Sequence, residues 1–201
     1  VIVGLALFSG ILGTGHHFYW IGAPGYWQWI GSIFSTLEVA PFFTMVLFTF
    51  VMTWKAGRNH PNRAALLWSI GCSVMAFIGA GIWGFLNTLS FTNYYTHGTQ
   101  LTAAHGHLAF FGAYVMLNLA VMAYAIPELK NRAPYNQWLS IVSFWLMVPA
   151  MMVMTFALTF AGVVQTHLQR VLGQSYMEVQ DQLGLFYWVR LGSGIVGVVA
   201  A

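Results

Sequence analysis

The stretch Gln100-Leu-Thr-Ala-Ala-His105-Gly-His107-Leu-Ala-Phe-Phe-Gly112 places two histidines inside an apolar run that contains no charged residue. Such a run predicts a helix surrounded by lipid or by other helices. At about 100° per residue, the side chains of His105 and His107 point about 200° apart on that helix. One helix could therefore hold a metal group on each flank, because ionisable residues at membrane depth usually mark function. The alternative is a pair of packed histidines that hydrogen-bond to neighbouring helices.

The sequence on both sides of this stretch is almost free of charge. Asp, Glu, Lys and Arg make up 5% of the 201 residues, against roughly 25% in an ordinary soluble domain. None of them occurs between Arg63 and Glu128 or between Arg132 and Arg170. Runs of this length can cross a bilayer once or twice. The composition therefore predicts an all-α, polytopic helix bundle whose main surroundings are the lipid bilayer.

Six membrane spans account for the chain. We place them at about residues 1–20, 27–54, 64–89, 100–126, 137–165 and from 183 onward, with turn signals such as Gly22-Ala-Pro-Gly25 between them. The chain starts and stops within apolar sequence, so we expect residues 1–201 to form one transmembrane helical domain that is a fragment of a longer chain. The single cysteine, Cys72, excludes an internal disulfide framework.

The basic residues predict which side of the membrane each loop faces. Two loops of the six-span arrangement lie on one side and together hold Lys55, Arg58, Arg63, Lys130 and Arg132. The positive-inside rule makes that side cytoplasmic. The formal charge of +3 therefore reflects basic residues in loops, which indicate how the chain is oriented in the membrane. We expect no nucleic acid among the partners.

Two arginines belong to the other half of the bilayer. Arg170 is the only basic residue in the loops of the outer side. Arg190 comes early in the last span, where it could reach outward to the membrane surface or face an anionic cofactor group.

A second pair of histidines, His16 and His17, falls at the depth of His105. The pair lies about 5 residues before the outer end of the first span, and His105 lies about 5 residues after the fourth span enters from that side, so each is roughly 7 Å deep. Neighbouring helical residues project about 100° apart, so His16 and His17 can share an ion only with ligands from another helix. The pattern predicts a metal layer in the outer third of the bilayer. The alternative is an interfacial pair near a helix end.

Glu38 is the only carboxylate within a predicted span, in the segment Phe34-Ser-Thr-Leu-Glu38-Val-Ala-Pro41. A lone carboxylate at that depth requires protonation, a cation or hydrogen bonds. Pro41 has no N–H to donate to the carbonyl of Leu37, which leaves a polar backbone group beside Glu38. We expect Glu38 to ligate the metal or to carry protons to it. The alternative is a structural acid that pairs with a helix outside this chain.

The outer segment 87–99 is rich in hydrogen-bonding side chains, and we expect it to be a loop above the metal layer. Carboxylates of a haem bound in that layer would emerge here. His97 or Asn93 could hydrogen-bond to them, although loop capping explains Asn93 equally well.

Four stretches match a known family. They are Gly13-Thr-Gly-His-His-Phe-Tyr-Trp-Ile-Gly22, Tyr26-Trp-Gln-Trp-Ile-Gly31, Phe34-Ser-Thr-Leu-Glu38 and Tyr94-Tyr-Thr-His-Gly-Thr-Gln-Leu-Thr-Ala-Ala-His-Gly-His107. In these stretches the sequence resembles the catalytic subunits of bacterial nitric oxide reductases of the cytochrome c-dependent type, a branch of the haem–copper oxidase superfamily. The resemblance covers essentially the whole chain and implies six transmembrane helices that correspond to the C-terminal half of a twelve-helix fold.

The resemblance implies a role for each site residue. His16 and His17 would be two of three histidine ligands of a non-haem iron. His105 would bind the iron of the high-spin haem b3, and His107 the iron of the low-spin haem b. Glu38 would be the active-site glutamate that assists proton delivery. The third iron histidine, a ligating glutamate and the second low-spin haem ligand would lie outside this chain.

The resemblance also implies a reaction, a partner and a location. The enzyme would reduce two molecules of NO to N2O and water, with electrons from a small membrane-anchored cytochrome c subunit. It would span the bacterial inner membrane many times, with its active site toward the periplasmic side. A calcium ion is a further cofactor that the family admits, at a site mostly outside this chain.

Three other functions stay open at this point. They are a haem–copper terminal oxidase that reduces O2, a non-catalytic haem b protein that only transfers electrons, and a metal-free helical channel or scaffold. Glu38 beside the metal layer, and glycine at position 106 between the paired histidines, favour the reductase.

Overall fold

The computed structural model describes residues 1–56 and 60–201 of the chain, and the regular structure in these residues is helical. Arg58, one of the basic residues that predict orientation, lies outside them. The elements in chain order are α1 (Ile2–Gly13), η1 (Thr14–Phe18), α2 (Tyr26–Ala56), α3 (Arg63–Ala76), η2 (Phe77–Trp83), α4 (Gly84–Thr88), α5 (Ser90–Thr96), α6 (Gln100–Ala109), η3 (Phe110–Val115), α7 (Met116–Leu129), α8 (Gln137–Thr166), η4 (His167–Val171), α9 (Tyr176–Gln182) and α10 (Gly184–Ala200).

Four of the six predicted spans are confirmed by helix length and composition. They are Tyr26–Lys55, Arg63–Thr88, Gln100–Leu129 and Gln137–Val171. Helices α9 and α10 form a pair bent by 62° that passes the same test only when it is counted as one span. The first predicted span is the shorter apolar helix Ile2–Phe18. The described residues therefore have the architecture of a multi-pass membrane protein, with four or five helices of full span length.

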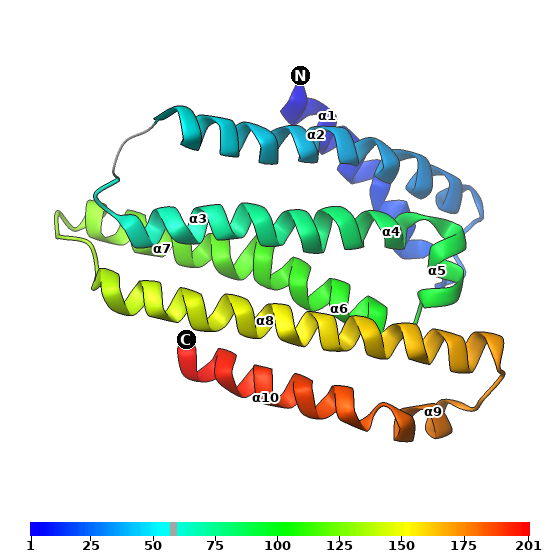
Figure 1. Cartoon of the computed structure of the whole chain (residues 1–201). Helices are drawn as coiled ribbons and strands as arrows, with labels where there is room; N and C mark the ends of the chain where they lie inside the picture. Colours follow the sequence, from blue (N-terminus) through cyan, green and yellow to red (C-terminus); the bar gives the residue numbers. More distant parts are fainter. Residues whose placement is uncertain (57–59) are drawn as a thin grey trace.

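The long helices run side by side. Figure 1 shows α3, the α6–α7 span and α8 in the middle of the bundle, with α1 and α2 on one side and α10 on the other. The two chain ends lie on these opposite sides.

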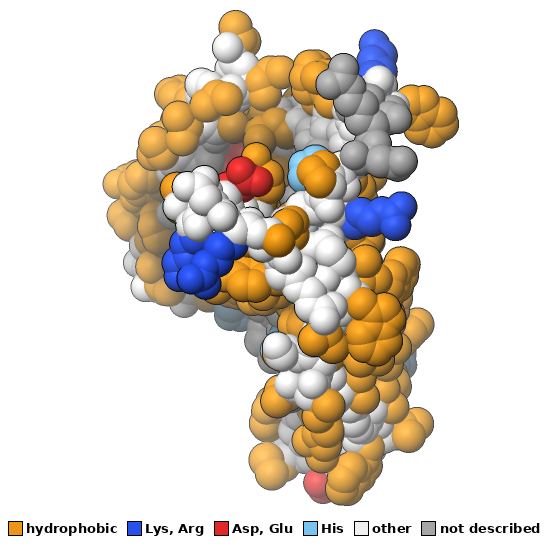
Figure 2. Space-filling view, turned by 90° about the vertical axis from the view of Figure 1, so that its left-hand side faces the viewer, with side chains coloured by type: hydrophobic (Ala, Val, Ile, Leu, Met, Phe, Trp, Pro, Cys, Tyr) orange, Lys and Arg blue, Asp and Glu red, His pale blue; other side chains and the backbone are white. Residues whose placement is uncertain are grey.

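Most basic side chains gather at one end of the bundle. Lys55 ends α2, Arg63 begins α3, and Lys130 and Arg132 lie in the turn between α7 and α8. Figure 2 views this end and shows Lys and Arg side chains around it, above flanks of hydrophobic side chains. An apolar flank with a basic end is typical of a membrane protein. The basic turns therefore lie at the same end of the bundle, and the side of the membrane that this end faces stays a prediction.

A buried core and hydrogen bonds between helices hold the central helices together. The buried core consists of Trp68, Met75, Leu108, Phe111, Met116, Ala120 and Phe144. Lipid is as apolar as these side chains, so close packing and interhelical hydrogen bonds carry much of the association energy. At the basic end, Asn62 Nδ2 donates to the carbonyl of Ala123 at 2.8 Å, and the Ala64 N–H donates to Gln137 Oε1 at 2.9 Å. Near the opposite end, the Gln100 N–H donates to Gln165 Oε1 at 2.9 Å.

Glycines let two of these spans meet backbone to backbone. A Cβ added at Gly79 would lie 2.6 Å from the nitrogen of Ala109, and one added at Gly112 would lie 2.6 Å from the carbonyl carbon of Met75. Both glycines lie in π-helical segments, η2 and η3. Such wide turns occur frequently at functional sites because they release backbone groups from the regular ladder.

The structure corrects three predicted boundaries. The segment 90–99, expected as a loop, contains helix α5, which begins after the extended residue Leu89. Helix α7 runs through Pro127 to Leu129 and does not end at residue 126, because a proline near the end of a helix removes only one hydrogen bond. The predicted loop 166–182 contains η4 and α9, the latter started by a capping box in which Ser175 and Glu178 bond reciprocally.

Candidate active site

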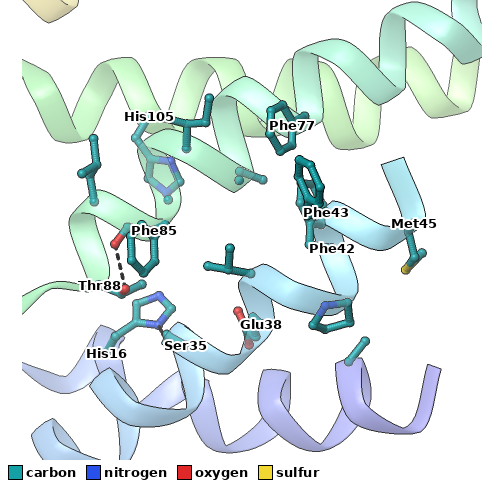
Figure 3. Close-up of a pocket in the computed structure, with 18 of the residues that line it drawn as sticks. His16, Ser35, Glu38, Phe42, Phe43, Met45, Phe77, Phe85, Thr88 and His105 are labelled. Carbon is teal, nitrogen blue, oxygen red and sulfur yellow. Dashed lines mark hydrogen bonds between the residues drawn. The ribbon is translucent and has the colours of Figure 1, made fainter. Parts of the chain in front are cut away.

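A cavity of about 480 Å³ lies where η1, α2, the α3–α4 span and α6 meet. Its chemically active lining residues are His16, His17, Ser35, Glu38 and His105. In Figure 3 the rings of His16 and His105 face this space from opposite walls, and Glu38 lies at its edge. The structure therefore brings together histidines that are far apart in the sequence, as the depth argument predicts.

Ser35 determines which nitrogen of His16 is free. The Nδ1 atom of His16 lies 2.7 Å from Ser35 Oγ, and Ser35 Oγ lies 3.1 Å from the carbonyl oxygen of Gly13. A carbonyl can only accept, so the single hydroxyl proton of Ser35 goes to Gly13. Ser35 then accepts from the Nδ1–H of His16, which leaves Nε2 as a lone-pair donor for a metal.

His17 lies directly beside His16. Their ring centroids are 4.1 Å apart, and both side chains line the cavity. The prediction of a 100° divergence assumed an α-helix, whereas η1 is a 3-10 turn, in which neighbouring residues diverge by about 120°. Their rings nevertheless remain neighbours, because side-chain rotation brings both imidazoles to the same cavity.

His105 is held by a backbone carbonyl across the helix interface. Its Nδ1 donates to the carbonyl oxygen of Gly79 at 2.8 Å, so Nε2 is again the free nitrogen. A Cβ at Gly84 would lie 3.3 Å from His105 Cε1, so this glycine leaves room for the imidazole ring.

His107 faces a different space. It lines a groove of about 550 Å³ together with Met154 of α8 and residues of α10 that include Tyr187 and Arg190. Its Nδ1 donates to the carbonyl of Ala103 at 2.7 Å, one turn earlier, so Nε2 is free here as well. A Cβ at Gly106 would meet no described atom within 4 Å. The two-sided arrangement expected from a separation of 200° is therefore present.

Glu38 projects from α2 against the glycines of α1. A Cβ added at Gly13 would lie 2.7 Å from Glu38 Oε1, and one added at Gly10 would lie 3.4 Å away. These glycines form a recess that holds the half-buried carboxylate next to the histidines. The backbone contact with α2 continues in η1, where a Cβ at Gly15 would lie 2.6 Å from the carbonyl oxygen of Trp27.

Sequence reasoning missed this recess. Gly10 and Gly13 stand three residues apart and so lie on one face of the first helix, where small residues allow close helix packing. That signal could have indicated which face of the first helix meets the second. It could not have indicated that the acid of the second helix fills the gap.

His97 and Asn93 line neither of these two cavities. Asn93 Oδ1 accepts from Trp20 Nε1 at 2.5 Å, and Asn93 Nδ2 donates to the carbonyl of Asn87 at 2.8 Å. The ring of His97 stacks on Trp20, with centroids 4.8 Å apart. These contacts support the capping alternative for Asn93, and the contact of either residue with a haem carboxylate stays a prediction.

The nitrogen and oxygen atoms that line the cavity are of the kinds that bind iron, but they do not form a complete set of ligands. Imidazole nitrogens and a carboxylate oxygen are ligands that iron accepts, and haem iron commonly takes a histidine on one face. Within residues 1–56 and 60–201, no three His, Cys, Asp or Glu side chains are grouped closely enough to hold a metal ion by themselves. Among the described residues, His16 and His17 therefore offer an incomplete set of protein ligands for a metal.

Comparison with known proteins points to one family. The family model described as Cytochrome C and Quinol oxidase polypeptide I matches residues 1–196. A nitric oxide reductase subunit of Stutzerimonas stutzeri is 53% identical over 203 residues, which cover 97% of this chain and 43% of that protein. The chain thus spans less than half the length of this curated relative.

Proposed function

We propose that this chain, which belongs to the cytochrome c and quinol oxidase polypeptide I family, is part of the catalytic subunit of a nitric oxide reductase. The reaction would be 2 NO + 2 electrons + 2 protons to N2O + H2O. The observation that carries the proposal is the two-sided arrangement around α6. One cavity combines His16, His17, Glu38 and His105, and a separate groove holds His107.

Three cofactors fit the free nitrogens. His105 would hold a high-spin haem b3, His107 would hold a low-spin haem b, and His16 with His17 would hold a non-haem iron that shares its remaining ligands with another part of the protein. When bound, these irons would pass on the electrons from the donor and provide the positions where NO binds. Calcium is a further proposed cofactor, with no site among the residues named for the irons.

The chain's own residues prepare these positions. Ser35 and the carbonyl of Gly79 hold the rings of His16 and His105 in fixed tautomers, which limits reorganisation during the reaction. Apolar lining residues such as Phe42, Phe77 and Phe85 exclude water from the cavity. Holding two small molecules together in such a space favours their coupling through proximity.

Glu38 is the proposed proton donor and catalytic residue. Among the described residues it is the only Asp or Glu side chain that lines the cavity, and it lies against Gly10 and Gly13. A carboxyl group at this position can hold a proton close to the oxygen atom that leaves as water. The same carboxylate favours the reductase over a copper-containing terminal oxidase, because a mixed oxygen and nitrogen donor set suits iron better than copper.

Location and partner follow from the same proposal. The basic end of the bundle would face the cytoplasm, and the cavity lies toward the opposite end, so the active site would face the periplasm of a bacterial inner membrane. Electrons would come from a small membrane-anchored cytochrome c subunit and would reach the His107 side before the His105 side.

The proposal is tested with the complete protein and its partner subunit. We expect anaerobic NO consumption and three irons for each catalytic subunit, two of them in haem. One copper with two haems, together with O2 reduction in place of NO turnover, would establish the terminal oxidase instead. A single low-spin haem without NO turnover would indicate an electron-transfer protein.

The Glu38→Gln variant tests the proton role. We expect normal haem content and a decrease in NO turnover of about 10²-fold or more, because a positioned acid or base typically contributes 10²–10⁴-fold. Thr36→Ala is the matched control, since Thr36 is exposed on the same helix and bonds only to the carbonyl of Ser32 at 2.8 Å. Full activity of Glu38→Gln would rule out the proton role.

A further inference from the structure

Arg190 is a charged residue within the last membrane helix. It is the seventh residue of α10, which runs from Gly184 to Ala200, so it lies about 9 Å along the helix from its start. Arginine at this depth is costly unless it pairs with an anion or reaches the membrane surface. In the described part of the chain its guanidinium has no hydrogen bond or ion pair with another side chain.

The acidic residues of the chain do not supply a partner within the described residues. Glu38 lines the other cavity, and Glu128 lies at the basic end of the bundle. The carboxylate of Glu178 is engaged by the N–H and hydroxyl of Ser175. Asp181 lies in α9, on the far side of the 62° bend between α9 and α10.

The groove beside Arg190 indicates what the missing anion is. Arg190 and His107 line the same groove of about 550 Å³, together with the hydroxyl-bearing Tyr187. The other lining residues are Met154, Leu191, Gly194, Ile195, Val198 and Val199, which are apolar. The groove thus offers one free imidazole nitrogen and one positive charge between apolar walls. These features match a flat apolar group that carries both an iron and carboxylates.

We propose that Arg190 pairs with a carboxylate of the haem bound by His107 and raises the reduction potential of that haem. This inference rests on the proposed function, because it requires a low-spin haem at His107. A positive charge near the haem favours the reduced iron, which carries one positive charge less than the oxidised iron. Charge and hydrogen bonding around a haem are among the means by which a protein sets its potential. Arg190 would thereby make this haem a better acceptor for electrons that enter from the partner subunit.

The experiment is a redox titration of the low-spin haem absorbance in the complete protein with its partner subunit. We compare the unmodified protein with Arg190→Gln, Arg190→Lys and Arg170→Gln. Arg170→Gln is the matched control, because it removes the same charge from the same side of the membrane, and Arg170 is exposed, contacts the carbonyl of His97 and does not line the groove.

We expect Arg190→Gln to shift the oxidised-to-reduced ratio at a fixed potential by about tenfold toward the oxidised form, which is a decrease of about 59 mV for one electron. Arg190→Lys keeps the charge and should retain most of the potential. An intact low-spin spectrum with a potential equal to that of Arg170→Gln would overturn the inference, and would indicate that Arg190 pairs with lipid or with another part of the protein.

Two other outcomes are equally informative. If Arg190→Gln loses the haem, the haem content of Arg190→Lys distinguishes the two roles of Arg190. Retention of the haem in Arg190→Lys supports an ionic contact. Equal loss in both variants shows a packing role and overturns the inference. Absence of a low-spin haem from the unmodified protein is a different result, which contradicts the proposed function itself.

Discussion

Replacing Ser35 with alanine tests how the chain orients His16. The substitution removes the acceptor that lies 2.7 Å from His16 Nδ1 and the donor that lies 3.1 Å from the carbonyl of Gly13. Ser35 is 3% exposed, so the freed groups gain little access to solvent. The ring of His16 can then rotate or change tautomer, and Nε2 is no longer committed to the metal.

The expected magnitude follows from these two bonds. Loss of a hydrogen-bond partner behind a metal-binding histidine typically weakens metal affinity 10- to 100-fold, which is about 1.4–2.7 kcal/mol. Loss of the hydrogen bond from Ser35 to the carbonyl of Gly13 removes about 0.5–1.5 kcal/mol from the contact between η1 and α2. The proposed haems would be held by His105 and His107, which do not bond to Ser35, so haem content should change little.

The assay is the ratio of non-haem iron to haem in the purified complete protein, followed by competition with an iron chelator. We expect Ser35→Ala to release its non-haem iron at chelator concentrations about 10- to 100-fold lower than the unmodified protein does. Thr36→Val is the control, because its hydroxyl bonds only to the carbonyl of Ser32. Equal iron retention in Ser35→Ala and in the unmodified protein would refute the argument that Ser35 fixes the tautomer of His16.

Two further substitutions test the remaining geometry. Gly13→Ala should displace Glu38, because the added Cβ would lie 2.7 Å from Glu38 Oε1. We expect NO turnover to fall by about 10-fold or more with haem content retained, because misplacing a catalytic group slows the reaction. Normal turnover would show that the recess does not position the carboxylate. His107→Ala should remove the low-spin haem spectrum and leave the high-spin haem partly assembled, because His105 and His107 line separate cavities. Optical and electron paramagnetic resonance spectra measure both haems. Equal loss of the two haems would contradict the two-sided assignment.

Much of the fold was predictable because membrane spans are a matter of composition. The long uncharged runs predicted helices at 27–54, 64–89, 100–126 and 137–165, and the structure has spans at Tyr26–Lys55, Arg63–Thr88, Gln100–Leu129 and Gln137–Val171. The first helix is shorter than expected, and the last is of span length only together with α9. Charge patterns do not encode such bends, because a bend depends on local backbone geometry.

The candidate site was predictable in part. Two histidines two residues apart on one helix must face different sides, and the structure places His105 and His107 in different cavities. Equal depth correctly indicated that His16 and His105 share a layer. The angle predicted for His16 and His17 assumed an α-helix, and the 3-10 turn Thr14–Phe18 cannot be recognised from its residues alone.

By itself, the sequence determined that the chain crosses a membrane as helices, which end of the bundle is basic, and which imidazole and carboxylate groups lie within the bilayer. These properties depend on hydrophobicity and on residue spacing along one helix, both of which are local. Only the tertiary structure decided that Glu38 rests against Gly13, that Ser35 orients His16, and that Arg190 shares a groove with His107. Each of these contacts joins two helices, and the rotation of one helix against another is set by the packing of side chains and glycines along the whole interface.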